Sequence, residues 1–200
     1  MTEEERDFIK TFFNLTPTEK ATVVARMHNS FNFAFAVVTL LASALVLRKD
    51  GFKPDEISWV ILNLSIPLLG HFFIRTCKDY LNQIRFSHLQ KVCSSSLAGV
   101  SPRSYDEIWA QIKLYYIDWT APTSRFEVIR KSMTEHGFLI LLIPIFLAHV
   151  YVGWFLLRQN PYMWLTLIGA LVLTAWDMSY GLTRWHFVRY TEADTMKGLH

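Results

Sequence analysis

GFLILLIPIFLAHVYVGWFLL, at Gly137–Leu157, and YMWLTLIGALVLTAWDMSYGL, at Tyr162–Leu182, are the two stretches that decide the fold. The first carries no acidic or basic side chain apart from His149, and the second carries only Asp177. About 20 apolar helical residues span a bilayer core of roughly 30 Å, so each stretch is long enough to cross a membrane. A short polar loop at 158–161 joins them. The pair is therefore predicted to form an antiparallel transmembrane hairpin.

A second pair of apolar segments occurs earlier in the chain, at 30–47 and 57–74, separated by the charged loop 48–56. A buried helical hairpin of a soluble domain is the alternative interpretation of one such pair, but a repeated pair favours the membrane. The predicted fold class is all-α: a polytopic membrane protein with four transmembrane helices that extend into a small cytosolic helical cap. The charged residues lie mainly outside the four apolar segments, as is typical of such proteins.

Lysine and arginine decide the predicted topology. About sixteen of the twenty lie in the N-terminal, middle or C-terminal segments, which the positive-inside rule places in the cytosol. The acidic start MTEEERDFIK lacks the pattern of a signal peptide, so the first span is expected to stay in the protein. We expect a multi-pass protein of the bacterial inner membrane with both termini cytosolic. Its predicted divisions are cytosolic N-terminal helices at 1–29, transmembrane hairpin 1 at 30–74, a cytosolic helical stalk and cap at 75–136, transmembrane hairpin 2 at 137–182, and a cytosolic C-terminal extension at 183–200.

Helix boundaries are predicted from capping residues, which satisfy the first backbone N–H groups of a helix, and from helix breakers. Helices that run unbroken from membrane to cytosol can transmit a tilt or rotation between the two. In the first half of the chain, the capping residues and breakers predict an amphipathic helix at Glu3–Asn14, an N-cap at Thr16, a stalk that continues the second span to about Val92, and breakers at Ser94–Ser96 and Gly99. In the second half, they predict capping boxes at Ser104–Glu107 and Ser124–Glu127, an uninterrupted helix from Ser124 into the third span, and a helical extension at Thr183–Tyr190.

Five Asn, His or Asp side chains fall inside the predicted spans, and helical rise gives their depth. Asn63 and His149 lie roughly 9 to 12 Å from the outer ends, whereas Asn32, His71 and Asp177 lie roughly 21 to 23 Å from them. The sequence thus predicts two polar layers. An ionisable group in hydrocarbon is unfavourable, so Asp177 should face the bundle interior, a water cavity or a partner. These residues either hold helices together by hydrogen bonds or line an ion path.

An apolar and aromatic stripe follows the capping box at Ser104. It extends beyond the depth of lipid headgroups, so it must pack against the stalks, another copy or a different protein. This stripe is the predicted partner-docking surface, and its residues are Tyr105, Trp109, Ile112, Tyr115, Tyr116 and Trp119.

The chain carries no motif that brings reactive groups together. No HExxH, carboxylate cluster, Gly-rich phosphate loop or GxSxG elbow occurs, so we predict no metal, no cofactor and no catalytic residue. Ser132 and His136 share a helix face, but nothing orients them as a nucleophile and base. No basic run interleaved with aromatic residues predicts nucleic-acid binding. Cys77 and Cys93 are not in a metal-binding spacing and are expected to be unbridged thiols.

The absence of a reaction motif and the helical cap favour a non-enzymatic membrane sensor or scaffold. We expect it to form a homo-oligomer in the lipid bilayer and to control a cytosolic effector protein. One alternative is an ion channel or pore subunit lined by the intramembrane polar residues. A second is a membrane-embedded lipid-modifying enzyme that uses His71, His149 and Asp177.

The order and spacing of the four spans resemble small four-span bacterial membrane subunits of anti-phage systems, such as the membrane subunit of the Kiwa system. The resemblance covers the layout of the whole chain and rests on no specific motif, so it assigns no functional residue. It implies an oligomeric membrane assembly that senses a phage-induced disturbance and works with a soluble effector.

Overall fold

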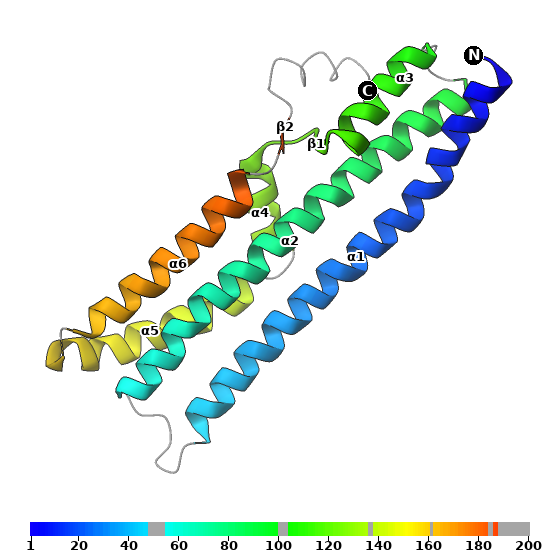
Figure 1. Ribbon diagram of the computed structural model, residues 1–200. Helices are drawn as coiled ribbons and strands as arrows, with labels where there is room; N and C mark the ends of the chain where they lie inside the picture. Colours follow the sequence, from blue (N-terminus) through cyan, green and yellow to red (C-terminus); the bar gives the residue numbers. More distant parts are fainter. Residues whose placement is uncertain (48–54, 100–103, 136–137, 161, 184–185, 188–200) are drawn as a thin grey trace. The chain divides into compact units, whose positions relative to one another are not determined.

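The computed structural model describes residues 1–47, 55–99, 104–135, 138–160, 162–183 and 186–187 (Figure 1). This part of the chain is almost entirely helical, and its strands amount to one parallel pairing of two residues each. The elements are α1 (Glu3–Val46), α2 (Glu56–Leu97), α3 (Tyr105–Ile112), the π-helix η1 (Lys113–Ile117), β1 (Thr120–Ala121), α4 (Arg125–Glu135), α5 (Phe138–Gln159), α6 (Met163–Thr183) and β2 (His186–Phe187).

Four of these helices are long and apolar enough to cross a membrane. Their most apolar 18-residue windows have mean hydropathies of 1.7 in α1, 1.8 in α2, 2.3 in α5 and 1.2 in α6. They contain the four segments that the sequence predicts as spans. The predicted fold class is confirmed: the chain is an all-α, multi-pass membrane protein.

The chain divides into two compact units. We call Met1–Met27, Cys77–Arg130 and Trp185–His200 the cap unit, and His28–Thr76 with Lys131–Arg184 the membrane unit. α1 and α2 each contribute residues to both units, whereas α5 and α6 belong to the membrane unit.

The predicted helix break at Thr16 is wrong, because α1 continues through Pro17. Thr16 is fully buried, and its hydroxyl donates to the carbonyl of Phe13 at 3.1 Å instead of capping a new helix. Proline inside a helix costs about 3 kcal/mol. Burial of Ile9 and Val23, which lie seven residues to either side of Thr16, offsets that cost by keeping one face of α1 packed.

The end of α2 is close to the prediction, but the three serines do not break the helix. The hydroxyls of Ser94 and Ser95 donate to carbonyls three residues back, so α2 continues to Leu97. Gly99 then adopts a φ of +69°, which suits glycine. The predicted capping box at Ser104 is confirmed, with Ser104 and Glu107 bonding each other's backbone N–H groups.

At Ser124 the hydroxyl accepts the N–H of Glu127 at 3.2 Å, as the second predicted capping box requires. The Glu127 carboxylate accepts a bond from the Thr123 hydroxyl at 3.0 Å. The predicted passage of this helix into the third span falls at 136–137, outside the described residues.

The predicted helical extension at Thr183–Tyr190 is wrong at His186–Phe187, whereas Thr183 is helical as predicted. α6 ends at Thr183, and His186–Phe187 forms β2, which pairs in parallel with Thr120–Ala121 of β1. Backbone pairing with a distant segment overrides the local helical pattern here. Positions 188–190 of the predicted extension lie outside the described residues.

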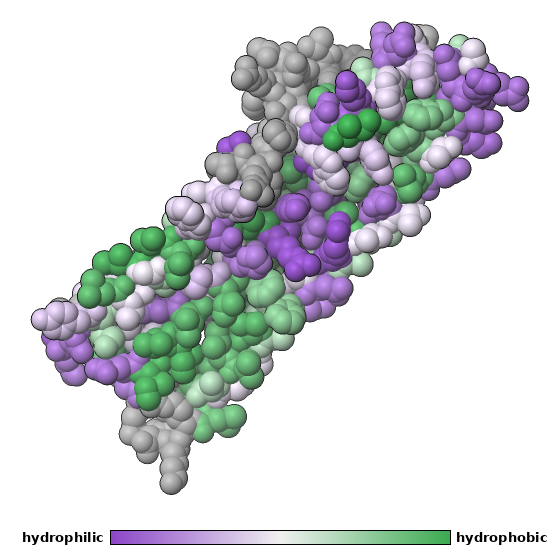
Figure 2. Space-filling view, viewed as in Figure 1, coloured by the Kyte–Doolittle hydropathy of each residue, from purple (hydrophilic) through white to green (hydrophobic). Residues whose placement is uncertain are grey.

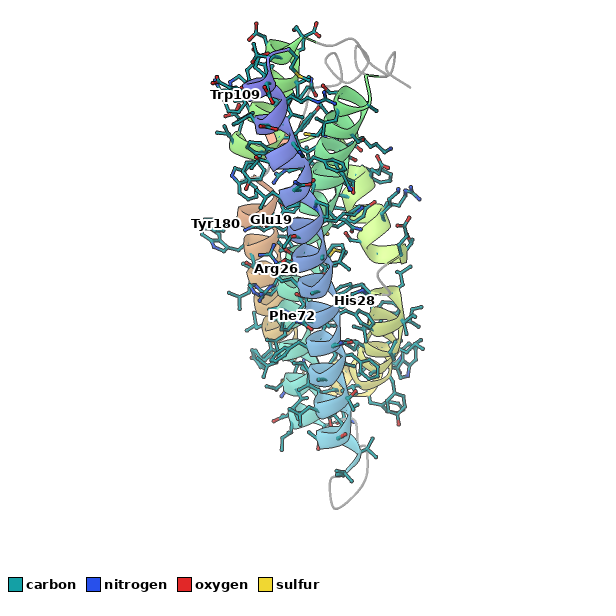
Figure 3. The ribbon with its side chains drawn as sticks, turned by 90° about the vertical axis from the view of Figure 1, so that its right-hand side faces the viewer. Glu19, Arg26, His28, Phe72, Trp109 and Tyr180 are labelled. Carbon is teal, nitrogen blue, oxygen red and sulfur yellow. The ribbon has the colours of Figure 1, made fainter. Side chains whose placement is uncertain are left out.

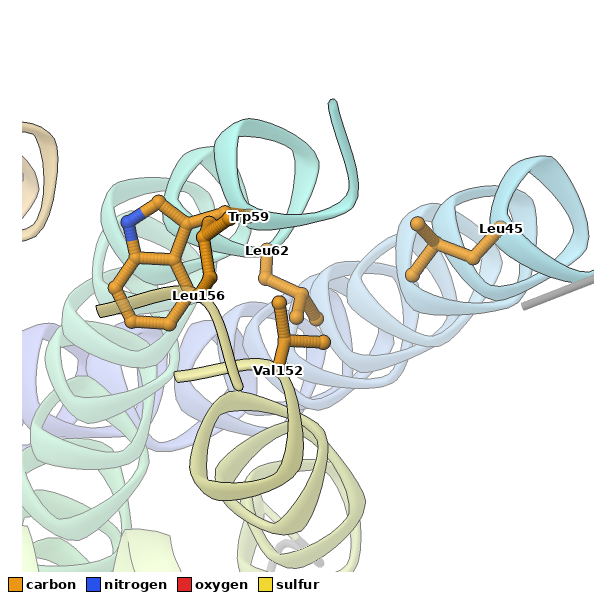
Figure 4. Close-up of a cluster of buried hydrophobic side chains, with 5 residues drawn as sticks. All are labelled: Leu45, Trp59, Leu62, Val152 and Leu156. Atoms are coloured by element: carbon orange, nitrogen blue, oxygen red, sulfur yellow. The ribbon is translucent and has the colours of Figure 1, made fainter. Parts of the chain in front are cut away.

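Two apolar clusters hold α1, α2 and α5 together in the membrane unit. The first is shown in Figure 4, where the Trp59 indole lies against the α5 side chains. The second lies around Phe138, whose ring meets Phe31 and Phe73 edge-on. Their buried members are Leu45, Trp59, Leu62, Val152 and Leu156 in the first cluster, and Ala34, Leu69, Phe138 and Leu141 in the second.

Both cysteines are buried and neither forms a disulfide. Burial raises the pKa of the Cys93 thiol to about 11, so it stays protonated near neutral pH. We predict that maleimide at pH 7.5 leaves Cys77 and Cys93 unmodified in the folded protein and modifies both in dodecyl sulfate. Intact mass measures the labelling, and a Phe126→Cys variant, exposed in the cap unit, is the positive control. Rapid labelling of the folded wild type would contradict the packing around these thiols.

Candidate functional site

α6 packs along α2 in a parallel orientation through polar contacts that follow the same order on both helices. The Trp59 Nε1–H donates to the Met163 carbonyl at 3.0 Å. One turn further on, the Asn63 amide donates to the Thr166 hydroxyl at 2.8 Å. Deeper in both helices, His71 meets Asp177. Interhelical hydrogen bonds of this kind fix helix register where the apolar effect gives little specificity.

Two glycines allow α2 and α6 to approach closely on either side of the His71–Asp177 pair. A Cβ atom at Gly70 would lie 2.7 Å from the Thr174 methyl group, and one at Gly181 would lie 2.7 Å from Cγ2 of Ile74. Real Cβ atoms essentially never approach so closely. Small residues at helix crossings are a common packing device in membrane proteins.

The deeper polar layer forms in part. His71 Nδ1 lies 3.1 Å from Asp177 Oδ2, and the two side chains are 62% and 41% exposed. Asn32 is exposed on α1, and within the described part of the chain no hydrogen bond joins it to this pair. His71 and Asp177 therefore lie at the same depth and meet. Asn32 lies at a similar depth, but the rotation of α1 about its own axis leaves it without a hydrogen bond to the pair.

The outer layer is built differently from the prediction. Asn63 bonds Thr166, while His149 Nδ1 lies 2.9 Å from the Ile145 carbonyl one turn back on α5. Both residues lie near Trp59: Asn63 follows it by one turn, and the His149 ring meets the indole at 5.7 Å between centroids. No hydrogen bond links Asn63 to His149 among the residues that the structure describes. These contacts join helices and place no reactive pair together.

The predicted docking stripe packs mainly on the cap unit itself. Ile112 and Tyr115 are buried, so their side chains are covered by the chain. The rings of Tyr105 and Trp109 lie beside Phe8 near the start of α1, with Trp109 labelled in Figure 3. Tyr116 contacts Phe12 and Phe86. Of the six predicted residues, Trp119 is the one classed as exposed, at 52%.

Trp119 and Arg85 form a feature that the sequence pattern did not reveal, which we call the Trp119 corner. Trp119 adopts a φ of +54°, a conformation uncommon for a large side chain. Arg85 on α2 donates to the Trp119 carbonyl and, at 2.7 Å, to Asn82 Oδ1. Its guanidinium also lies 5.2 Å from the centre of the indole. Arg85 thus holds the corner through two contacts with Trp119, and its bond to Asn82 fixes the guanidinium on α2.

Arg85 is a buried cation, with only 5% of its surface exposed. Burial lowers its pKa to about 10. Its Nε has no hydrogen-bond partner in the described structure. A π-helix, η1, ends two residues before Trp119, and such helices are frequent at functional sites. Strained backbone, a π-helix and a buried charge therefore coincide at the Trp119 corner.

Other candidate sites are less well formed. Among the described residues no three His, Cys, Asp or Glu side chains gather as a metal site. A pocket of about 750 Å³ in the cap unit is lined by charges of both signs from the start of α1, with Leu97. Ser132 is buried, and its predicted neighbour His136 lies outside the described residues.

No family model, curated protein or solved structure matches this chain. Function is therefore inferred from the geometry of the chain itself, and the likeness to the Kiwa membrane subunit stays a prediction.

Proposed function

We propose that the chain is a non-enzymatic sensor or scaffold of the bacterial inner membrane that acts as a homo-oligomer. In this proposal the cap unit and both termini lie in the cytosol, the side that the distribution of Lys and Arg favours. The protein couples an event in the bilayer to a cytosolic effector protein. Anti-phage defence is the setting that the layout of the spans suggests.

The continuity of α1 and α2 is the observation that carries this proposal. Each helix runs without interruption through residues of both units. An α-helix keeps its backbone hydrogen bonds when it tilts or rotates, so a displacement at one end reaches the other. A change in bilayer thickness or tension that tilts the membrane unit would therefore move the cap-unit halves of the same two helices.

A second connection runs through α6. This helix ends at Thr183, and the chain then forms β2, whose partner β1 begins directly after Trp119. Only 6% of the apolar window of α6 is buried inside the chain, compared with 39% for α2. α6 is thus the span least covered by the rest of the chain, and its displacement would act on the Trp119 corner through the strand pair.

Three exposed apolar side chains of the cap unit suit an effector. Ile117, Trp119 and Phe126 are close in sequence and are 49%, 52% and 74% exposed. We call these three residues the corner patch. Aromatic side chains with exposed apolar surface are typical centres of protein interfaces. The corner patch borders the strand pair that α6 leads into, so an effector bound there would respond to movement of that span.

The exposed His71–Asp177 pair supports a second candidate function, an ion channel, because charged groups in spans often line water paths. A lipid-modifying enzyme has less support, since His149 bonds the Ile145 carbonyl rather than joining His71 and Asp177. Both remain alternatives to be separated by experiment.

The test is purification of the full-length chain in nanodiscs from host membranes, with mass photometry and mass spectrometry. We expect a discrete oligomer that carries one soluble protein in a fixed ratio. Trp119→Ser should reduce the captured protein by about tenfold or more, because truncation of a central aromatic contact typically costs over 1 kcal/mol. Leu15→Ser, also on an exposed cap-unit position, is the matched control and should retain it.

Two results would contradict the proposal. A discrete oligomer that captures no protein and conducts ions in a planar bilayer would favour the channel. A monomer without a partner would exclude both the scaffold and the oligomeric channel.

A further inference from the structure

The His71–Asp177 pair lies deep in the spans and is exposed, although lipid is a poor environment for it. His71 is about 15 residues from the start of α2 and Asp177 about 14 residues from the start of α6, or roughly 21 to 23 Å along each helix. Both positions fall within the roughly 30 Å hydrocarbon core. An Asp facing lipid at such depth is unfavourable by several kcal/mol. The exposed sides of the pair, 62% and 41%, therefore need a protein or water cover.

The surface leading to this pair is apolar, which favours protein over water. Between Glu56, at the start of α2, and His71, the exposed residues of α2 are all apolar and form a stripe. A water-filled path would be expected to carry polar side chains along its length. Figure 2 likewise shows a mainly hydrophobic surface over α6 and the first half of α2. The stripe consists of Ile57, Val60, Leu64 and Leu68.

α1 and α6 flank this stripe. α2 lies between them in Figure 1, and in the membrane unit Phe33 of α1 meets Phe72 while Asp177 of α6 meets His71. Tyr180, one turn beyond Asp177, is 53% exposed and points away from the helices in Figure 3. Large side chains on both flanks thus border the surface that carries the His71–Asp177 pair, and the exposed Arg75 follows one turn further along α2.

From these observations we infer that a second copy of the chain docks on this face, with the His71–Asp177 pairs of the two copies meeting at the interface. The inference rests on the proposed homo-oligomer and identifies the surface that forms it. The face suits a two-fold dimer because it carries both an acceptor and a donor: Asp177 of one copy can accept from His71 of the other, and the reverse. The apolar stripes then pack together, and neither carboxylate faces lipid.

Cysteine cross-linking tests the location of the interface. Leu68→Cys places a thiol on the stripe, and Phe146→Cys places one on α5, which is 67% exposed at that position. In native membranes treated with copper phenanthroline, Leu68→Cys should form covalent dimers and Phe146→Cys should not. The buried Cys77 and Cys93 provide a low background.

The double variant His71→Leu/Asp177→Leu tests whether the polar pair drives dimerisation. It makes the face compatible with lipid, so the dissociation constant of the dimer, measured by energy transfer in vesicles, should rise about tenfold or more. Circular dichroism should show unchanged helix content. If the double variant misfolds, the single variant Asp177→Leu, which removes the carboxylate that lipid disfavours, is the second measure, and the dissociation constant should rise in the same way.

The outcomes separate this inference from the proposed function. A stable oligomer in which Phe146→Cys but not Leu68→Cys cross-links would overturn the interface and leave the sensor–scaffold proposal standing. Modification of Leu68→Cys in the assembled protein by a charged, water-soluble thiol reagent would show a water-lined path and also overturn the inference. A wild-type monomer would remove both.

Discussion

The double variant Gly70→Ala/Gly181→Ala is expected to melt about 5 to 10 °C below the wild type in detergent, measured by circular dichroism. Each added Cβ would lie 2.7 Å from a side-chain carbon of the facing helix. Thr174 cannot easily rotate away, because its hydroxyl donates to the Ala170 carbonyl at 2.8 Å. Overpacking of this kind typically costs 1–3 kcal/mol at each site, and each kcal/mol lowers Tm by a few degrees.

Gly169→Ala is the matched control, because a Cβ at Gly169 has no neighbouring atom within 4 Å. All three substitutions raise helix propensity by a similar amount, close to 1 kcal/mol per glycine. Gly169→Ala should therefore melt at or above the wild type, and the difference between the variants measures the close contact of α2 and α6. Equal melting temperatures for the double variant and the control would show that the helices pack further apart.

The four spans and the His71–Asp177 pairing followed from the sequence because they depend on distance along a helix. Apolar length fixed the four membrane helices, and capping chemistry fixed the start of α3 at Ser104. Counting rise from the outer ends placed His71 and Asp177 at similar depth. They meet because α2 and α6 run parallel and begin at the same end of the membrane unit.

Depth does not specify which way a side chain points around a helix, and the missed contacts reflect this. Asn32 lies at the same depth as His71, but on a face of α1 that does not bring it to the His71–Asp177 pair. Asn63 bonds Thr166 rather than His149. The sequence contained the hydroxyl of Thr166, but nothing in the pattern indicated that it faces α2. Rotation of a membrane helix is decided by packing against its neighbours, which a single sequence does not reveal.

Long-range contacts account for the errors in the cap unit. Continuation of α1 through Pro17 depends on burial of the face that includes Ile9 and Thr16. β2 exists because its backbone pairs with β1, which lies more than sixty residues earlier. The Trp119 corner needs Arg85 of α2, a residue that reads in sequence as part of an amphipathic stalk. Each case joins segments that local periodicity treats as independent.

Arg85→Lys is expected to destabilise the protein more than Arg85→Met. This order is the reverse of the one expected if the substitution that keeps the charge were the better tolerated. Arg85 donates to two separate acceptors, Asn82 Oδ1 and the Trp119 carbonyl, and one ammonium lacks the planar fork that reaches both. Lysine also keeps a charge that is unfavourable to bury. The lowering of the Arg85 pKa to about 10 by burial corresponds to a penalty of about 3 kcal/mol, which methionine removes.

Methionine also leaves two acceptors without these donors, at about 1–3 kcal/mol for a buried group. This loss is similar in size to the penalty that methionine removes, so the gain and the loss nearly cancel. Arg85→Met should therefore melt within a few degrees of the wild type and Arg85→Lys about 5 to 10 °C lower. Trypsin should cut Arg85→Met faster than the wild type at the exposed Lys113, because the Trp119 corner loses its clamp.

Arg26 provides the control because its environment is the opposite of that of Arg85. Its Nε lies 3.6 Å from Asp79 Oδ1, its own side chain is 48% exposed, and the Asp79 carboxylate is buried. Arg26→Lys keeps a cation beside that carboxylate, whereas Arg26→Met removes it, so lysine should be tolerated better than methionine here. A reversed order at the two arginines would establish Arg85 as a buried charge held in place for the Trp119 corner. The same order at both would show that Arg85 is a net stabilising cation.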